Sequence, residues 1–321
     1  MSFLKYFNMT FGAIGQIALI GLCGYIFTKI KAINEDGLRL ISNGVVNLLF
    51  PCYIFVSLVK NFNFQTYPKW WLFPLISLFI TLFGFCIGLF FCRIRKGYKK
   101  NEHEFISLIT FQNSGYLPLM LVNLIFGSPE REHLTIIIFL FLLGFNFVFW
   151  SLAPYYLGID KDRKIMIKNL FTPPVIAIIT SLILIASRLS IVIPRVFLGA
   201  VEMFGNCALP LAILVVGGSL AMLSNRYGGQ LMAILYLAAV KLIVLPLVCL
   251  VFIVLFRPSQ EIAFLILLQG AMPSATSLSV VTRQHNIEED IISLGIFWTH
   301  IIGLITIPVW LAILGSFSKL G

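Results

Sequence analysis

The chain has 321 residues, of which 59% are hydrophobic and 11% are charged, and its mean hydropathy is +0.98. Soluble domains usually carry about a quarter of charged residues, so this composition excludes a soluble protein and predicts an all-α polytopic membrane protein. The formal net charge of +10 does not indicate a nucleic-acid partner, because the basic residues stand in short clusters between apolar runs. The lipid bilayer is therefore the expected surroundings of most of the chain.

A helix that crosses a bilayer needs about 20 consecutive, mostly apolar residues. With a window of that length the sequence predicts ten transmembrane helices. They cover residues 11–27, 44–59, 70–92, 105–126, 134–157, 173–186, 196–223, 231–256, 262–282 and 291–314. The first run contains Gln16, lacks a small-residue cleavage pattern and leads into further spans, so we interpret it as a helix instead of a signal peptide.

The fourth apolar run, at 105–127, is interrupted in its middle. Polar, flexible or helix-breaking residues stand there at the depth of the hydrocarbon: Gln112, Asn113, Ser114, Gly115 and Pro118. In lipid every backbone N–H and C=O group needs a partner, so an unwound segment persists only when it is buried in protein or lines a polar cavity. Interrupted helices of this kind hold the substrate in secondary transporters.

Two motifs of the first half recur in the second half in the same order. Asn-x-x-x-Pro begins at Asn47 in the second span and at Asn206 in the seventh, and the interrupted stretch 112–118 has a counterpart at 269–273. Each half contains five spans, an odd number, so the second half enters the membrane from the opposite side and the repeats are inverted. Broken helices at matching positions of inverted halves predict a binding site near the bilayer midplane.

This interpretation divides the chain into a first five-helix repeat at 1–157, a cytoplasmic linker at 158–172 and a second five-helix repeat at 173–321. Fourteen Lys and Arg residues lie on the side of the linker and eight on the opposite side. Cytoplasmic loops collect the excess of Lys and Arg, so both termini are predicted to be non-cytoplasmic. The expected location is the plasma membrane, which is the cell inner membrane in a bacterium.

Five segments carry a resemblance to a known family: NLLFPCYIFVSL, FQNSGYLPL, NCALPLAILVVGGSL, KLIVLPLV and QGAMPSATSLSVV. Together they resemble the auxin efflux carrier family, which includes plant PIN carriers and bacterial permeases associated with malate. The resemblance spans nearly the whole chain. The central loop is short, unlike that of the larger plant carriers, which favours a bacterial-type or short-loop member and argues against auxin itself.

The resemblance implies a ten-helix fold in which the broken fourth and ninth spans cross at Pro118 and Pro273. It also implies a scaffold of the first, second, sixth and seventh spans, which mediates homodimer formation. The third to fifth and eighth to tenth spans then form a moving transport domain.

Two broken helices at a crossing direct half-helix N-termini into the cavity, which suits a carboxylate. The candidate substrate-binding residues are Gln112, Asn113, Ser114, Gly115, Gln269, Ser274, Thr276, Asn47 and Asn206. No Asp or Glu stands near either break, whereas a cation site would need a carboxylate there, so we expect an organic anion. The alternative is that these amides and hydroxyls only pair with backbone groups freed by the prolines, and for Asn47 and Asn206 the two alternatives are balanced.

Three further positions are candidates for support or coupling. Lys241 lies in the middle of the eighth span, where it either adds positive potential to an anion site or, as we favour, donates to carbonyls at the crossing. His300 matches Asn146 of the first half, and it is either structural or a proton-coupling group. Glu202 is expected to pair with Arg195 at the membrane edge.

The sequence lacks the motifs of the common catalytic classes. G-x-S-x-G, H-E-x-x-H and G-x-x-x-x-G-K do not occur, and the four histidines have no ligand spacing. The sequence therefore predicts no enzyme, no metal site and no cofactor, and broken inverted helices disfavour a receptor. We expect a secondary transporter for a small mono- or dicarboxylate, such as malate or an auxin-like acid, that works by alternating access. The alternative is a sodium-coupled organic-anion symporter of the bile-acid-carrier type.

Overall fold

The computed structural model describes residues 3–94, 101–157, 170–223, 231–284 and 290–317. The described residues are helical, with one isolated β-bridge. The helices of the first half are α1 Phe3–Lys29, α2 Glu35–Gly44, η1 Val45–Leu49, α3 Phe50–Asn61, α4 Leu72–Ile94, α5 Glu102–Thr110, α6 Tyr116–Ile125 and α7 Glu130–Tyr156. Those of the second half are α8 Pro173–Ala186, η4 Leu189–Val192, α9 Arg195–Asn206, α10 Ala208–Leu223, α11 Leu231–Ala239, η5 Val240–Val244, α12 Leu245–Phe256, α13 Gln260–Gly270, α14 Ser277–Gln284 and α15 Asp290–Phe317.

Among the described residues, seven helical stretches are long and apolar enough to cross a membrane. They are Phe3–Lys29, Glu35–Asn61, Leu72–Ile94, Glu130–Pro154, Arg195–Met222, Leu231–Phe256 and Ile291–Ser316. Three shorter apolar helices, α6, α8 and α13, complete the set. The prediction of a polytopic, all-helical membrane protein is thereby confirmed, whereas the count of ten spans and the inverted repeat stay predictions.

Several helices begin earlier than the apolar runs suggested, and the second stretch shows why. It starts at Glu35, well before the predicted run at 44–59. The side chain of Asn34 accepts a 2.8 Å hydrogen bond from the N–H of Gly37, and Glu35 and Asp36 occupy the first turn. A capping side chain and acidic residues stabilise a helix N-terminus. Hydropathy detects only the part of a helix that lies in hydrocarbon, so it misses such polar ends.

Two of the long stretches contain a π-helical turn just before a proline. η1 precedes Pro51 and η5 precedes Pro246, which stand in the first turns of α3 and α12. A proline in a helix removes one N–H donor and clashes with the carbonyl four residues earlier, and a π turn relieves that clash. For Pro246 that carbonyl belongs to Leu242, and the indole N–H of Trp310 donates to it at 2.8 Å.

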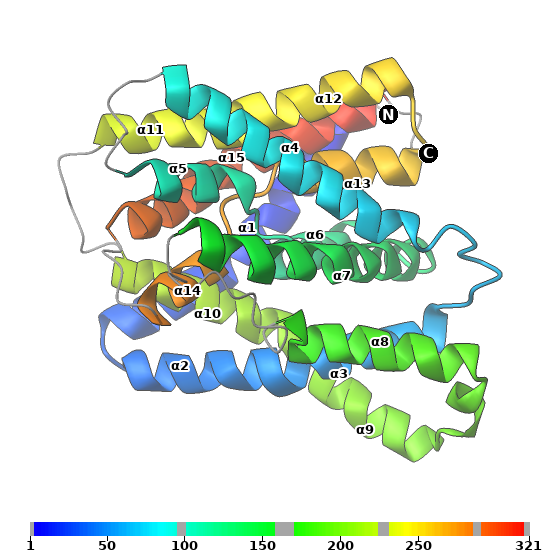
Figure 1. Ribbon diagram of the computed structural model, residues 1–321. Coiled ribbons are helices and arrows are strands. Elements are labelled where there is room, and N and C mark those ends of the chain that lie inside the picture. The colour runs from blue at the N-terminus through cyan, green and yellow to red at the C-terminus, as the bar shows by residue number, and fades with distance from the viewer. Residues whose placement is uncertain (1–2, 95–100, 158–169, 224–230, 285–289, 318–321) are drawn as a thin grey trace.

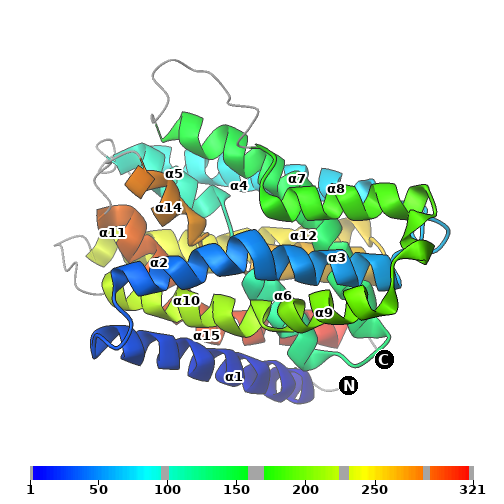
Figure 2. The same cartoon turned by 90° about the horizontal axis from the view of Figure 1, so that it is seen from below.

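The helices form two groups that run roughly parallel to one another (Figures 1 and 2). In one group α3 packs against α8 and α9, and α1 packs against α10. In the other group α4 packs against α5 and α7, and α11 packs against α15. The contacts of α1 with α15 and of α3 with α7 join the two groups, and α7 lies on the side of its group that faces α3 and α8 (Figure 1).

Glycine brings α1 and α10 into direct backbone contact. A Cβ atom on Gly217 would collide with the carbonyl group of Gly21, and one on Gly24 would collide with that of Leu214. Small residues allow such close approach between helices in membranes, where packing drives association. We conclude that α1 and α10 form a tightly packed pair.

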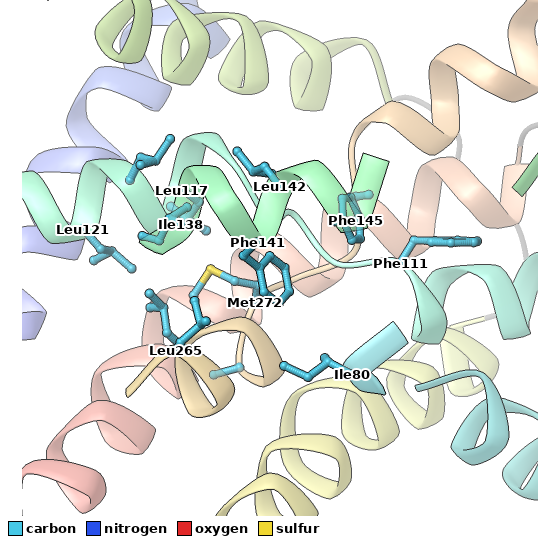
Figure 3. Close-up of a cluster of buried hydrophobic side chains, with 14 of the residues drawn as sticks. Ile80, Phe111, Leu117, Leu121, Ile138, Phe141, Leu142, Phe145, Leu265 and Met272 are labelled. Carbon is cyan, nitrogen blue, oxygen red and sulfur yellow. The ribbon is translucent and has the colours of Figure 1, made fainter. Parts of the chain in front are cut away.

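Buried aromatic and aliphatic side chains surround the middle of the second group (Figure 3). Met272 lies next to Phe141 of α7, and Phe111 and Phe145 lie beside the same connection between helices. All four side chains are buried. This packing surrounds the points at which α5 and α13 end, and it positions the segments described below.

Candidate functional site

The two predicted interruptions are real breaks in the helices. α5 ends at Thr110 and α6 begins at Tyr116, whereas α13 ends at Gly270 and α14 begins at Ser277. The intervening residues, 111–115 and 271–276, form the first and second unwound segments. Pro118 stands at the third position of α6, where a missing N–H costs nothing because first-turn N–H groups have no helical partner.

The two unwound segments pair with each other in an antiparallel β-bridge centred on Gln112 and Ser274. The N–H of Asn113 donates to the carbonyl of Pro273 at 2.8 Å, and the N–H of Ala275 donates to the carbonyl of Phe111 at 2.9 Å. Each segment thus satisfies polar backbone groups of the other, which allows unwound chain to exist inside an apolar bundle. The structure therefore brings the two motifs of the predicted repeat into direct contact.

Side chains from the second half pair with the last carbonyls of α5 and with the first unwound segment. The hydroxyl of Ser274 donates to Leu108 O at 2.8 Å, and the amide of Gln269 donates to Ser114 O at 3.2 Å. The N–H of Ser274 is itself held by Thr299 Oγ1 at 3.2 Å. Gln269 and Ser274 are fully buried, and these bonds direct them to the backbone.

Lys241 is completely buried, with 0% of its surface exposed. Its Nζ donates to the carbonyl of Ile109 at 2.6 Å, one residue before the end of α5. The last four carbonyls of a helix lack helical partners, and cationic groups interact favourably with that end of the helix dipole. This geometry corresponds to the second of the two roles considered for Lys241.

Asn113 and His300 meet beside the first unwound segment. The Nδ2 atom of Asn113 lies 3.4 Å from Nε2 of His300, and Nδ1 of His300 lies 2.8 Å from the carbonyl of Ile296. A carbonyl only accepts hydrogen bonds, so Nδ1 carries the proton and Nε2 accepts from the Asn113 amide. Asn146 makes the corresponding bond in the first half, because its Nδ2 donates to Leu142 O at 2.8 Å, also one helical turn earlier.

A cavity of about 160 Å³, which we call the crossing cavity, lies beside the bridge. It is lined by residues from both unwound segments, from α7 and from the start of α8. Five predicted substrate-binding residues line it, together with the predicted supporting residue Asn146: Gln112, Asn113, Ser114, Gly115 and Thr276. No Asp or Glu is among the described residues of its lining.

Gln112 lines the crossing cavity, and neither hydrogen-bonding atom of its side chain has a partner among the described residues. The residue is 1% exposed, and the two atoms without a partner are Nε2 and Oε1. A buried polar group without a partner is unfavourable, so its presence indicates a ligand or a water molecule in the working protein. Gln112 therefore differs from Gln269, whose Nε2 is bonded to backbone although its Oε1 has no partner among the described residues.

A second, larger cavity of about 480 Å³ shares Val46, Tyr116, Thr276 and Ser277 with the crossing cavity and reaches the start of α2 at Glu35. We call it the wide cavity. The two cavities are therefore adjacent, and the wide cavity extends from these shared residues to α2.

Asn47 and Asn206 are not among the residues that line the crossing cavity. Asn47 is exposed on η1. Asn206 lines a separate cavity of about 270 Å³, which we call the far cavity, together with Lys60 and Glu202. Glu202 does not pair with Arg195, as expected from sequence, but with Lys60 of α3 at 2.7 Å. Arg195 stands two turns earlier on the same helix, whereas α3 packs directly against α9.

Sequence reasoning missed several residues of the crossing cavity. Its aromatic wall includes Phe145, Phe149 and Trp150 of α7, which the sequence does not distinguish from side chains facing lipid. Thr172, just before α8, also lines the cavity. The two prolines that follow Thr172 predicted the start of a helix, but nothing in the sequence marked the hydroxyl of Thr172 as functional.

The fold and the paired breaks define a membrane protein of the transporter class, and comparison with known proteins supplies the family. Residues 9–154 and 160–311 match the family described as "Membrane transport protein", so the chain belongs to that family. The resemblance to the auxin efflux carrier family is thereby confirmed, and the members are transporters, not enzymes.

The relatives agree with this assignment. The chain is 22% identical to Protein PIN-LIKES 1 of Arabidopsis thaliana, across 97% of this chain and 79% of that protein. It is 22% identical to Protein PIN-LIKES 7 of the same plant, across 97% and 98%. It is 24% identical to an uncharacterized transporter of Methanothermobacter thermautotrophicus, across 93% and 96%. The coverage of these relatives agrees with a short-loop, PIN-like member.

Proposed function

We propose that this protein is a secondary transporter that binds a small organic anion, a mono- or dicarboxylate, at the crossing cavity and moves it by alternating access. The observation that carries the proposal is the buried amide of Gln112, which lines this cavity without a hydrogen-bond partner among the described residues. An amide N–H₂ group donates to a carboxylate oxygen, and a bound anion would satisfy it.

The ends of two half-helices support an anion over a cation. Gly115 and Tyr116 at the start of α6, and Thr276 and Ser277 at the start of α14, line the crossing cavity. Helix N-termini present free N–H groups and the positive end of the helix dipole, which favour negative charge. The described lining contains no carboxylate that would repel an anion or coordinate a cation.

An aromatic cluster between two cavities supports alternating access. The ring of Phe50 lies 4.9 Å from that of Tyr116 and 6.3 Å from that of Phe139, and the Phe139 ring lies 5.5 Å from that of Tyr53. Phe50 and Tyr116 line the crossing cavity, whereas Tyr53 lines the far cavity and accepts a 3.0 Å hydrogen bond from Asn123. In this proposal the rings block access to the crossing cavity from the side of the far cavity, and the substrate enters from the side of the wide cavity.

The helix contacts support the proposed ten spans and inverted repeats at 1–157 and 173–321, joined by the linker at 158–172. α1 packs against α10 and α15 of the second half, and its proposed counterpart α8 packs against α3 and α7 of the first half. Inverted repeats predict this, because the partners of α8 are the proposed counterparts of the partners of α1. Asn146 and His300 make matching bonds to the carbonyl one turn before them. In this arrangement α1, α2–α3, α8 and α9–α10 form the scaffold, and the other helices form the moving transport domain.

Location and assembly complete the proposal. α1 begins beside the end of α15, where Tyr6 approaches Gly315, so both chain ends lie at one end of the bundle (Figure 1). With the basic loops in the cytoplasm, both termini would be non-cytoplasmic. We propose a plasma-membrane protein that forms a homodimer through the scaffold.

The test is uptake of radiolabelled carboxylates into proteoliposomes that contain the purified protein, with and without a sodium gradient and at several pH values. We expect saturable uptake by the wild type and its loss in Gln112→Leu. Gln16→Leu is the matched control, because Gln16 is exposed on α1, far from the crossing in sequence and absent from the lining of the crossing cavity. Equal uptake by wild type and Gln112→Leu, or no carboxylate uptake at all, contradicts the proposal, and strict sodium dependence would favour a sodium-coupled symporter.

A further inference from the structure

Thr172 occupies the N-cap position of α8 but does not act as a cap. An N-cap hydroxyl normally accepts a hydrogen bond from the N–H of the second or third helical residue. In α8 the first two helical residues are Pro173 and Pro174, which have no N–H, and the Thr172 side chain makes no capping bond. Its carbonyl accepts the first helical bond, from the N–H of Ile176 at 2.9 Å, whereas its hydroxyl makes no local hydrogen bond.

Thr172 lines the crossing cavity, and its hydroxyl is buried in the wall of that cavity. Its Oγ1 atom is inaccessible to solvent and has no hydrogen-bond partner among the described residues. The same holds for both side-chain atoms of Gln112, which line the same cavity. Two unpartnered polar side chains around one small cavity indicate a ligand with hydrogen-bonding atoms for both.

The two side chains belong to different parts of the bundle. Gln112 is in the first unwound segment, whereas Thr172 begins α8, which packs against α3, η1 and α7. Three aromatic side chains of α7, Phe145, Phe149 and Trp150, line the same cavity. A ligand that bonds to both residues therefore needs two polar groups and a part that packs against aromatic side chains.

We propose that Thr172 is a substrate-positioning residue: its hydroxyl donates to an oxygen of the anion, and Gln112 holds a second oxygen. This inference rests on the proposed function, and it assigns the scaffold a direct contact with the substrate. The preferred substrates are short carboxylates with a second polar group, because an acid with a single polar end leaves one of the two side chains unsatisfied. Movement of the transport domain relative to α8 breaks the bond to Thr172, which couples that movement to release.

The experiment measures binding to purified protein by thermal shift and by competition for uptake, with three probes: succinate, butyrate and indole-3-acetate. Succinate and butyrate have chains of equal length but two and one carboxylates. We expect Thr172→Val, which keeps the shape and removes the hydroxyl, to weaken succinate binding about tenfold and butyrate binding much less. Thr172→Ser keeps the hydroxyl and should bind succinate as the wild type does.

Thr180→Val is the matched control, because Thr180 lies on the same helix with its side chain exposed and away from the cavity. A purely structural role for Thr172 would lower the melting temperature without ligand and affect all probes alike, which would overturn the inference. Equal succinate affinity in wild type and Thr172→Val, or equally weak binding by Thr172→Val and Thr172→Ser, overturns it as well. If Gln112→Leu still abolishes binding in that case, the proposed function stands.

A second measurement covers the case in which Thr172→Val does not fold. In Thr172→Cys, succinate should slow labelling of residue 172 by a thiol reagent, followed by peptide mass spectrometry. Labelling that is equally fast with and without succinate overturns the inference. No response of the wild type to any of the three acids overturns the inference and the carboxylate transport proposal together.

Discussion

The two unwound segments each interrupt an apolar helical run and pair with each other, but their polar side chains behave differently. In the first segment the buried amide of Gln112, a residue that lines the crossing cavity, has no described partner. In the second, Ser274 is bonded through both its N–H and its hydroxyl, to Thr299 and to Leu108. We infer that the first segment presents side chains to a ligand and that the second holds the backbone in place.

The helix ends before the two segments differ in the same way. α13 ends with local turns, in which Ala271 N donates to Leu267 O at 2.9 Å and Met272 N donates to Gln269 O at 3.4 Å. The end of α5 also depends on distant side chains, because Ser274 and Lys241 donate to its last carbonyls. α13 thus ends in its own local turns, whereas the end of α5 also depends on tertiary contacts.

The largest effect is expected for Lys241→Met, which removes the donor to Ile109 O at a fully buried site. An unsatisfied buried carbonyl costs about 1–3 kcal/mol, so we expect a stability loss of about 2 kcal/mol and a clear fall in melting temperature. Lys60→Met is the control, because the Lys60–Glu202 pair is partly exposed and contributes little. If Lys241→Met is as stable and as active as the wild type, Lys241 neither stabilises the end of α5 nor contributes to substrate binding.

The next largest effect is expected for Gln269→Leu, whose stability we compare with that of Gln112→Leu. Gln269→Leu removes the donor to Ser114 O and should lower the free energy of unfolding by about 1–2 kcal/mol. Gln112→Leu removes an amide without a partner, so it should leave stability unchanged or raise it by about 1 kcal/mol while abolishing binding. Thermal unfolding of both variants in the same detergent measures the difference. Equal destabilisation by the two substitutions would contradict the different roles inferred for Gln112 and Gln269.

A smaller effect is expected for Ser274→Ala, which leaves Leu108 O without its hydroxyl donor but keeps the backbone bridge. We expect a stability loss of about 1 kcal/mol and little change in substrate affinity. Ser187→Ala is the control, since Ser187 makes its hydrogen bonds at an exposed position of the chain. A large loss of affinity in Ser274→Ala with unchanged stability would place the second segment at the ligand.

The smallest effect on folding is expected for Asn113→Ala. The 3.4 Å contact of its amide with His300 is long, and its N–H, which pairs with Pro273, is retained. Substrate affinity should nevertheless fall about tenfold if the amide donates to the anion. Unchanged affinity, measured by the same thermal-shift titration, would remove Asn113 from the proposed site.

Much of the candidate site was predictable because its signals are local. Polar residues and a proline at 112–118, inside an apolar run, have few explanations other than a break in the helix. Lys241 was expected to brace the crossing for a similar reason, since a cation in hydrocarbon needs a partner. The pairing of Glu202 with Lys60 was not predictable, because it depends on which helix packs against α9.

The sequence by itself determined the membrane class, the family and the positions of the two breaks, because hydropathy and helix-breaking residues act over one or two helical turns. The tertiary structure alone decided how the two unwound segments divide their roles. Whether an amide bonds to backbone, as Gln269 does, or lines a cavity without a described partner, as Gln112 does, depends on atoms from distant helices. The position of Thr172 at the crossing cavity also depends on tertiary contacts, because the packing of α8 against α3 and α7 places it there. No local motif marks this residue.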